Sequence, residues 1–396
     1  MQRPVLIVFS HLRWGFVYQR PQHLLSRLAD RWQILFVEEP VHTEAPARLE
    51  VREEDGVSVL VPHSPVPACG FHDDQIGVIQ TLLDAYLTAH SLTVDTAWLY
   101  TPMALPLANA VAPACFVYDC MDELSAFQGA PRQLRQRESA LMQQAGLVLT
   151  GGPSLYEARK SQHPNIHCFR SSVDASHYAP GNLDPDSSGA RIARSLQETL
   201  PHPRLGFFGV IDERFDLELL HDMACRHPEW SLVMVGPVVK IDASSLPRHP
   251  NVHWLGMQSY ETLPHLLAGW DVALMPFAMN ESTRFISPTK TLEYMAGDKP
   301  VASTPVQDVM ALYASGVAIA PASHPFIEAC EGLLAEDEQA RQARHTEMAR
   351  LVSAGSWDAT ADAIHELLAE ALQRARETAD TAPAVLDDAE AEKAVA

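Results

Sequence analysis

The chain has 396 residues, 47% hydrophobic and 20% charged, which is the composition of a globular protein long enough for two domains. Its formal net charge of -21 repels the phosphate backbone of nucleic acids, so general binding of DNA or RNA is excluded. No signal peptide is visible and no run approaches the ~18–20 apolar residues of a membrane span, so we expect a soluble, cytoplasmic protein.

The cysteines give no sign of a metal site. None forms a Cys-x-x-Cys pair, and their spacing matches no zinc pattern. We interpret them as reduced thiols, as in the cytosol. They are Cys69, Cys115, Cys120, Cys168, Cys225 and Cys330.

The first half of the chain alternates short apolar runs with helical patterns. Apolar strands are expected at 5–10, 34–38, 58–61, 97–100, 115–119 and 146–151. Helices are expected at 21–29, 74–90 and 131–144. Continuous apolar strands that alternate with helices are typical of a parallel sheet covered on both faces.

The same alternation restarts after a polar segment at 181–203, which is rich in Gly, Pro and Ser and reads as an inter-domain linker. Strands are expected at 205–209, 231–236, 253–256, 271–277 and 300–303, with helices at 216–225, 259–269 and 289–296. The sequence therefore predicts an α/β fold with two Rossmann-like domains that face each other across a cleft.

Five segments follow from this pattern. The last of them is rich in Ala and acidic residues and lacks large apolar groups, so we expect it to be disordered. The segments are an N-terminal domain (1–180), the linker (181–203), a C-terminal domain (204–355), a closing helix (356–376) and an acidic tail (377–396).

The most informative stretch for function is 277–304. A polar loop leads to Pro288, a helix carries Thr289, Lys290 and Glu293, and Gly297 ends it. Loop amides and a helix N-terminus suit phosphate oxygens, and Lys290 adds a full positive charge. Glu293 lies three residues further on the same helix face, where its carboxylate can accept both ribose hydroxyls. These residues predict a site for a nucleotide-diphosphate sugar.

This stretch resembles the donor-site signature of GT-B glycosyltransferases of the group 1 class, in the run PTKTLEYMAGDKPV. The resemblance implies that Glu293 binds the nucleotide ribose. RSSVDASHY (170–178) resembles the element between the family's domains, and SWDATADAIHELL (356–368) resembles the helix that crosses back to the first domain. Many retaining members carry a second Glu eight residues before the first; here that position is Phe285, and Glu281 has a different spacing. We therefore expect inversion.

Candidates for the catalytic base lie in VYDCMDELSAF (117–127), at the carboxyl end of an expected strand. An inverting transfer needs a carboxylate that takes the proton of the acceptor hydroxyl. The segment resembles the base-bearing loop of inverting bacterial exopolysaccharide glucuronosyltransferases, which points to Asp122. Asp119 and Glu123 remain alternatives, and an acidic residue here can also cap the next segment.

The loop after the first strand supplies further candidates for binding a phosphate or the acceptor. After the first strand, Arg13 and Arg20 could meet a phosphate or an anionic acceptor, and His11 and Trp14 are further candidates in the same loop. Each of these has a structural alternative as a salt bridge or a buried aromatic residue.

In the second domain, Arg214 stands where the group 1 class often has a phosphate-binding Arg or Lys. Gly209 would let the backbone approach the diphosphate.

The leading hypothesis is a glycosyltransferase that uses a nucleotide-diphosphate sugar and a glycan or lipid-linked acceptor, with peripheral contact at the inner membrane face left open. A nucleotide-sugar epimerase, a non-catalytic GT-B subunit that scaffolds polysaccharide assembly and a pyridoxal-phosphate phosphorylase are alternatives. No cofactor is expected. No metal is expected either, because the one Asp-Pro-Asp, at 184–186, lies in the linker.

Overall fold

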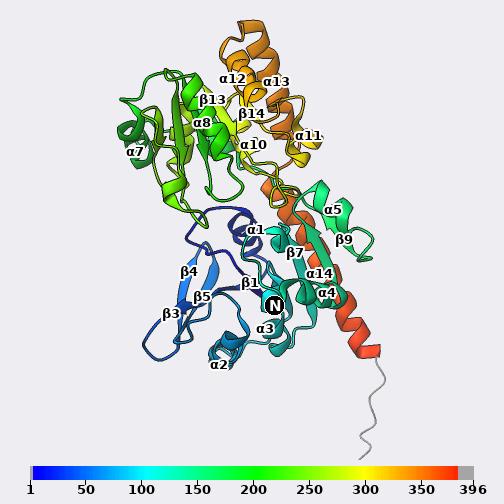
Figure 1. Ribbon diagram of the computed structural model, residues 1–396. Coiled ribbons are helices and arrows are strands. Elements are labelled where there is room, and N and C mark those ends of the chain that lie inside the picture. Colours follow the sequence, from blue (N-terminus) through cyan, green and yellow to red (C-terminus); the bar gives the residue numbers. More distant parts are fainter. Residues whose placement is uncertain (1–2, 382–396) are drawn as a thin grey trace, which may run out of the picture.

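The computed structural model describes residues 3–381, which form two α/β domains stacked end to end (Figure 1). Each domain is built on its own sheet, and the predicted fold class is confirmed. Among the described helices, none combines the length and the apolar character that crossing a membrane requires.

The first domain follows the predicted alternation and adds elements that the sequence did not signal. Its strands are β1 (Val5–Ser10), β2 (Gln33–Glu38), β3 (Val41–His42), β4 (Arg48–Glu54), β5 (Val57–Ser64), β6 (Thr96–Leu99), β7 (Cys115–Cys120), β8 (Leu147–Thr150) and β9 (Ile166–Cys168). Its helices are α1 (Arg20–Leu28), α2 (Asp73–Ala89), α3 (Leu105–Ala110), α4 (Leu134–Gln144) and α5 (Pro153–Arg159). The short helix α6 (Ala175–Tyr178) follows and packs against the core of the second domain.

The second domain repeats the plan with shorter strands. These are β10 (Arg204–Phe208), β11 (Ser231–Val235), β12 (Val252–Trp254), β13 (Val272–Met275), β14 (Val301–Ser303) and β15 (Ala318–Ile319). The helices after α6 are α7 (Ser188–Gln197), α8 (Leu217–Arg226), α9 (Leu263–Ala268), α10 (Lys290–Ala296), α11 (Gln307–Tyr313), α12 (His324–Leu334), α13 (Glu338–Ser353) and α14 (Trp357–Thr381).

Both sheets are wound in the manner of nucleotide-binding folds. The strand order is β3-β5-β2-β1-β6-β7-β8-β9 in the first sheet, with β4 antiparallel on β5, and β12-β11-β10-β13-β14-β15 in the second. Along β1, Ile7 and Phe9 join the core on one face of the sheet while Leu6 and Val8 join the core on the other. Burial on both faces explains why the strands read as unbroken apolar runs.

The C-terminal helix α14 packs on the first domain, in contact with α1, β7 and β8. Trp357, Ile364 and Leu368 are buried there in the core below α1, and Figure 1 shows the helix running along this domain. The sequence predicted a disordered tail from Glu377, and this boundary is wrong because Glu377–Thr381 continue α14. Within that helix the Gln373 side chain donates to the Glu377 carboxylate at 2.9 Å. Residues 382–396 lie outside the described residues.

The segment expected as a linker holds a regular element. Within 181–203, helix α7 is capped by Ser187, whose hydroxyl accepts from the Ala190 amide at 3.1 Å. Its buried face carries Ala193 and Gln197 and packs on α9 of the second domain. Its buried residues recur at helical spacing, so the periodicity was present in the sequence, and the Gly, Pro and Ser content of the segment led to the interpretation as a linker instead.

Candidate functional site

A cavity of about 680 Å³ lies between the two domains, at the carboxyl ends of strands from both sheets. Its lining comes from the loops after β1 and β7 in the first domain and after β10, β11 and β13 in the second. Open parallel sheets bind their ligands at this edge, because the loops of neighbouring strands converge there. The cavity is therefore the candidate active site.

Helix α10 brings Thr289, Lys290 and Glu293 into this cavity, as the sequence predicted for one site. Glu293 is only 8% exposed, and burial raises the pKa of its carboxyl to about 7 against the opposing charge of Lys290. Burial likewise lowers the pKa of the Lys290 ammonium. A buried carboxylate and a half-buried ammonium thus line the same cavity, where one polar ligand can contact both.

Packing against β10 holds α10 in place. The Phe208 amide donates to the Tyr294 hydroxyl at 3.0 Å, which ties the helix to the end of that strand. The helix ends at Gly297, where a Cβ would overlap the Leu267 side chain. The local sequence thus fixes both the direction and the length of the helix that carries Lys290 and Glu293.

Two glycines let the backbone approach closely beneath Lys290. Gly209 and Gly236 follow β10 and β11, and both have φ of +144°, a conformation that favours glycine. A Cβ on Gly209 would overlap the Lys290 side chain, and one on Gly236 would overlap the Gly209 carbonyl oxygen. Side chains larger than hydrogen would therefore push Lys290 out of its position.

Arg214 also lines the cavity, but it is already paired. Its Nε and Nη2 donate to the Asp212 carboxylate at 2.9 and 2.7 Å, and its guanidinium lies 5.2 Å from the centre of the Phe127 ring. The Lys240 ammonium lies 4.7 Å from the same ring. Phe127 of the first domain thus contacts two cations of the second, and sequence reasoning missed Asp212, Phe127 and Lys240 because their proximity depends on how the domains meet.

Asp122 lies in the cavity wall opposite these cations. Burial raises the pKa of its carboxyl, while the charges of Arg214, Lys290 and Lys240 oppose that rise. Among residues 3–381 its carboxylate forms no ion pair within 4 Å, so it is available to a ligand.

The second half of the chain matches a known family. Residues 202–336 match the family model for glycosyl transferases group 1. The second domain is thus similar to the group 1 glycosyltransferase domains that this model describes. The resemblance inferred from the donor-site signature is thereby confirmed.

Known relatives agree with this assignment. The chain is 24% identical over 281 residues to TuaH of Bacillus subtilis, described as a glycosyltransferase of teichuronic acid biosynthesis, with 65% of this chain and 68% of TuaH covered. Among solved structures, sucrose-phosphate synthase of Thermosynechococcus elongatus matches with a TM-score of 0.71 at 14% identity, covering 93% of this chain and 99% of that one. Anabaena HepE in complex with UDP-glucose matches with a TM-score of 0.68 at 16% identity, covering 92% and 99%. The fold is thus GT-B.

The two alternative candidates for the base, Asp119 and Glu123, lie outside the residues that line the cavity. Asp119 is fully buried and does not line the cavity, because the Arg20 Nε donates to its carboxylate at 2.9 Å. Glu123 is held by Arg159 at 2.6 Å and by Ser125 at 2.6 Å. Of the three acidic residues, the structure presents Asp122 to the cavity.

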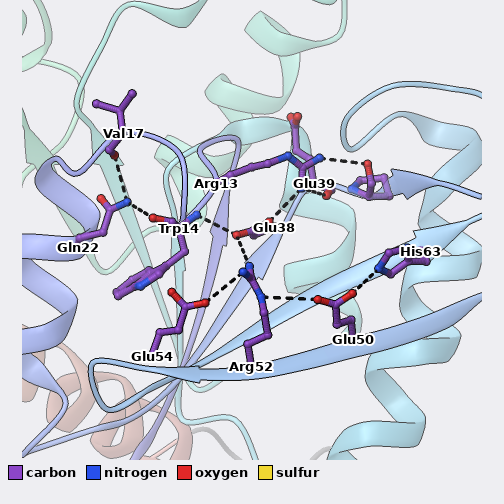
Figure 2. Close-up of polar contacts among 11 residues, drawn as sticks. Arg13, Trp14, Val17, Gln22, Glu38, Glu39, Glu50, Arg52, Glu54 and His63 are labelled. Atoms are coloured by element: carbon purple, nitrogen blue, oxygen red, sulfur yellow. Dashed lines mark hydrogen bonds and ion pairs between the residues drawn. The ribbon is translucent and has the colours of Figure 1, made fainter. Parts of the chain in front are cut away.

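Arg13 lies outside the residues that line the cavity, and its role in the structure is to shape the loop after β1 (Figure 2). Its Nη1 donates to the Glu38 carboxylate at 3.0 Å and to the Glu39 carbonyl at 3.2 Å. Glu38 is 2% exposed and also accepts from the Trp14 amide at 2.8 Å and from Arg52 at 3.4 Å. Glu38 is thus the anchor of this loop.

Of the other candidates in the loop after β1, some line the cavity and others are buried in the core of the domain. Trp14 lines the cavity, with its ring packed edge-on against Phe36 at 5.1 Å. Arg20 reaches the cavity edge, but it is 1% exposed and also donates to the Phe169 carbonyl at 2.7 Å. Its role is therefore structural, because it joins α1 to the segment after β9. His11 is absent from the lining, and burial with the nearby Lys240 charge lowers its pKa to about 4.

Aromatic residues of both domains complete the wall. Tyr18, which the sequence suggested as a residue that could stack on a sugar or lipid, stacks instead on Tyr260 of the second domain, with ring centroids 4.6 Å apart. Tyr260 also stacks on His177 at 3.9 Å. Tyr178 lies in the wall near Glu293 and is 1% exposed. No motif marks Tyr260, because its contact with Tyr18 forms only once the domains are assembled.

Proposed function

We propose that the protein transfers a sugar from a nucleotide-diphosphate sugar to a glycan or lipid-linked acceptor in polysaccharide or cell-envelope synthesis. The observation that carries the proposal is that the half-buried Lys290 and the buried Glu293 of α10 line one cavity together with Asp122. Such a transfer requires a cation for the diphosphate, a group that accepts hydrogen bonds from the ribose hydroxyls, and an unpaired carboxylate as the base.

The donor is held by the second domain. The Glu293 carboxylate accepts hydrogen bonds from the ribose hydroxyls, and Lys290 and Arg214 face the diphosphate. Gly209 and Gly236 carry no side chain that would keep the phosphates away from the backbone. Thr289 adds a hydroxyl at the start of the same helix.

The chemistry begins at Asp122. Its carboxylate takes the proton of the acceptor hydroxyl while the acceptor oxygen bonds to the anomeric carbon of the sugar. The bond from that carbon to the phosphate oxygen breaks, and the electron pair leaves with the nucleoside diphosphate. Lys290 and Arg214 stabilise the negative charge that develops on this leaving group.

Inversion of the anomeric carbon follows from this single displacement. The position of a second glutamate in retaining enzymes is Phe285, which packs against the core of the first domain. Glu281 has an 82% exposed side chain, 3.7 Å from Arg284, and is absent from the cavity lining. A carboxylate at the retaining position is therefore missing from the described site.

The relatives support this choice of substrates. HepE has been solved with UDP and with UDP-glucose, and TuaH is described as a teichuronic acid enzyme. UDP-sugars are therefore the first donors to test, with a cell-envelope glycan as acceptor and peripheral contact at the inner membrane face as the setting.

The test is incubation of the protein with a panel of radiolabelled UDP-sugars and lipid-linked or oligosaccharide acceptors. We expect free UDP together with a labelled acceptor. An altered sugar on intact nucleotide would identify an epimerase instead, and binding without turnover across the panel would identify a scaffold subunit.

A further inference from the structure

A cluster of metal-ligating side chains lies on the second domain, outside the cavity. Within residues 3–381, His221, Cys225 and His249 are the one group of this kind whose ligand atoms all lie within 4.8 Å of one another. None of the three lines the cavity between the domains. We propose that they bind one Zn²⁺ ion.

The helix supplies two of the ligands. His221 and Cys225 lie four residues apart on α8, which places them on one face of the helix, one turn apart. The opposite face is buried through Leu219, Leu220 and Met223, so the ligand pair faces outward. His249 comes from the segment before β12 and meets this pair from the side.

The distances suit a tetrahedral ion. The Cys225 Sγ lies 3.6 Å from the His221 Nε2 and 3.9 Å from the His249 Nε2. Zn–S and Zn–N bonds of about 2.3 and about 2.05 Å at tetrahedral angles separate such ligand atoms by about 3.6 Å. The other nitrogen of the His221 ring, Nδ1, lies 2.8 Å from the His249 Nε2, so the two imidazoles are hydrogen-bonded to each other, and an ion bound by one nitrogen of each ring would replace this contact.

The ligand chemistry selects the metal. One thiolate and two imidazoles suit borderline-soft Zn²⁺ and are poor ligands for Mg²⁺ or Ca²⁺, which prefer oxygen. The Cys225 thiol releases its proton to solvent as the Zn–S bond forms, because the thiolate is the form that binds the metal. His221 and Cys225 are exposed, which leaves the fourth position open to water.

The ion would link α8 to the segment that precedes β12. The Asn251 side chain already joins these elements, donating to the carbonyls of Ala224 at 3.3 Å and His227 at 3.0 Å. The segment that ends at His249 begins at Pro237 in the cavity wall. The site would therefore fix the far end of a loop whose near end faces the donor.

The cysteine spacing gave no warning of this cluster. The spacing of the cysteines alone overlooks the His221–Cys225 pair, four residues apart on one helix. The third ligand, His249, is 28 residues from His221 and joins the pair only through the β11–β12 connection.

The experiment titrates the full-length, reduced protein with ZnCl₂ in competition with a chromophoric chelator, and with CoCl₂ in an absorption spectrometer. We expect one equivalent of Zn²⁺ and a sulfur-to-cobalt charge-transfer band. Cys225→Ser should abolish the band, and His221→Ala and His249→Ala should each weaken Zn²⁺ by more than ~100-fold, since even outer partners of metal ligands are worth about 10–100-fold.

Two exposed residues away from the cluster provide matched controls. Cys69→Ser and His345→Ala remove one thiol and one imidazole, and both variants should bind Zn²⁺ as the wild type does. Equal Zn²⁺ affinity in wild type and Cys225→Ser, or a cobalt spectrum without the thiolate band, would overturn the proposal. Because the substituted side chains are exposed or half-buried, the variants should fold, which circular dichroism checks.

Discussion

At the scale of single residues, Glu293 shows how burial prepares a group for a ligand. Its carboxylate is 8% exposed, and within residues 3–381 it has no ion-pair partner inside 4 Å. An unpaired buried carboxylate costs folding free energy, so it is retained where a ligand later satisfies it. The raised pKa of about 7 is the measurable sign of that cost.

Binding of the nucleotide should therefore depend on pH. The Glu293 carboxyl can accept from both ribose hydroxyls only when it is deprotonated, so the affinity for UDP should fall as the pH drops below about 7 and level off near that of a neutral side chain. Glu293→Gln keeps the shape and should weaken UDP at pH 8 by about 1.5–3 kcal/mol. Calorimetry from pH 5.5 to pH 8 measures both effects. The Gln variant is also the control, because its UDP affinity should change with pH only through titration of the nucleotide itself. If the wild-type affinity changed with pH in the same way as that of the variant, Glu293 would not belong to the site.

Asp122 gives the second prediction at this scale. Asp122→Asn keeps the size but removes the proton acceptor, so kcat should fall by about 10²–10⁴. Donor affinity should stay or rise, since a negative charge facing Arg214 and Lys290 is lost. In the wild type, burial raises the pKa of Asp122, so the acid limb of kcat/KM should lie above the usual range of an aspartate. Steady-state kinetics over pH, with NMR of the product anomer, measures these quantities.

Asp119→Asn and Glu123→Gln serve as comparisons in the same assay. Asp119→Asn breaks a fully buried ion pair with Arg20, so its loss of activity should follow a loss of thermal stability. Full activity in Asp122→Asn would show that another residue is the base, and a retained anomeric configuration in the product would reject the inverting mechanism.

At the scale of elements, the loop after β1 depends on one buried carboxylate. Glu38, at the end of β2, holds the side chain of Arg13, the amide of Trp14 and the side chain of Arg52 (Figure 2). The Gln22 amide at the start of α1 donates to the carbonyls of Trp14 at 2.7 Å and of Val17 at 3.2 Å. The cavity wall is thus fixed from both ends.

Removal of Glu38 should loosen this loop. Glu38→Ala leaves the Trp14 amide buried without its acceptor, so we expect the free energy of unfolding to fall by about 1–3 kcal/mol, with faster proteolysis near residue 14. Glu50→Ala, which removes an exposed carboxylate from the same network, should change stability by less than about 1 kcal/mol. Urea unfolding of both variants decides the point, and equal losses would show that burial of Glu38 is unimportant.

The sequence predicted the elements with strong periodicity and missed those that depend on context. The apolar strands from β1 to β14 stand out because burial on both faces requires continuous hydrophobic residues. Strand β4 was missed, because Arg48–Glu54 is a polar, largely exposed edge strand. In the site, Lys290 and Glu293 were found because one helix carries both, whereas Phe127 and Tyr260 were missed because they meet their partners across the domain interface.

At the scale of the whole molecule, one side chain joins the domains beside the cavity. Asp308 on α11 of the second domain accepts a hydrogen bond from the Ser154 amide, at the start of α5 in the first domain, at 3.0 Å. Gly152 leaves room for it, because a Cβ there would overlap the Asp308 carboxylate. The carboxylate thus caps a helix of the other domain, and this contact can form only while the domains are close together.

Donor binding should favour this closed arrangement. We expect UDP to lower the radius of gyration in small-angle X-ray scattering, with motion where the chain crosses between the domains, at 170–172 and at the start of α14, because α7 in the segment 181–203 packs on the second domain and moves with it. Asp308→Ala removes a helix cap worth about 1 kcal/mol, so it should shift the domains about fivefold towards the open form and raise the radius without ligand. Asp337→Ala removes a comparable cap inside one domain, where the carboxylate accepts from the Ala340 amide at 2.8 Å, and should leave the radius unchanged. If saturating UDP leaves the wild-type radius as it was, and Asp308→Ala matches Asp337→Ala, the two domains form a rigid pair and the cavity binds its donor without closing.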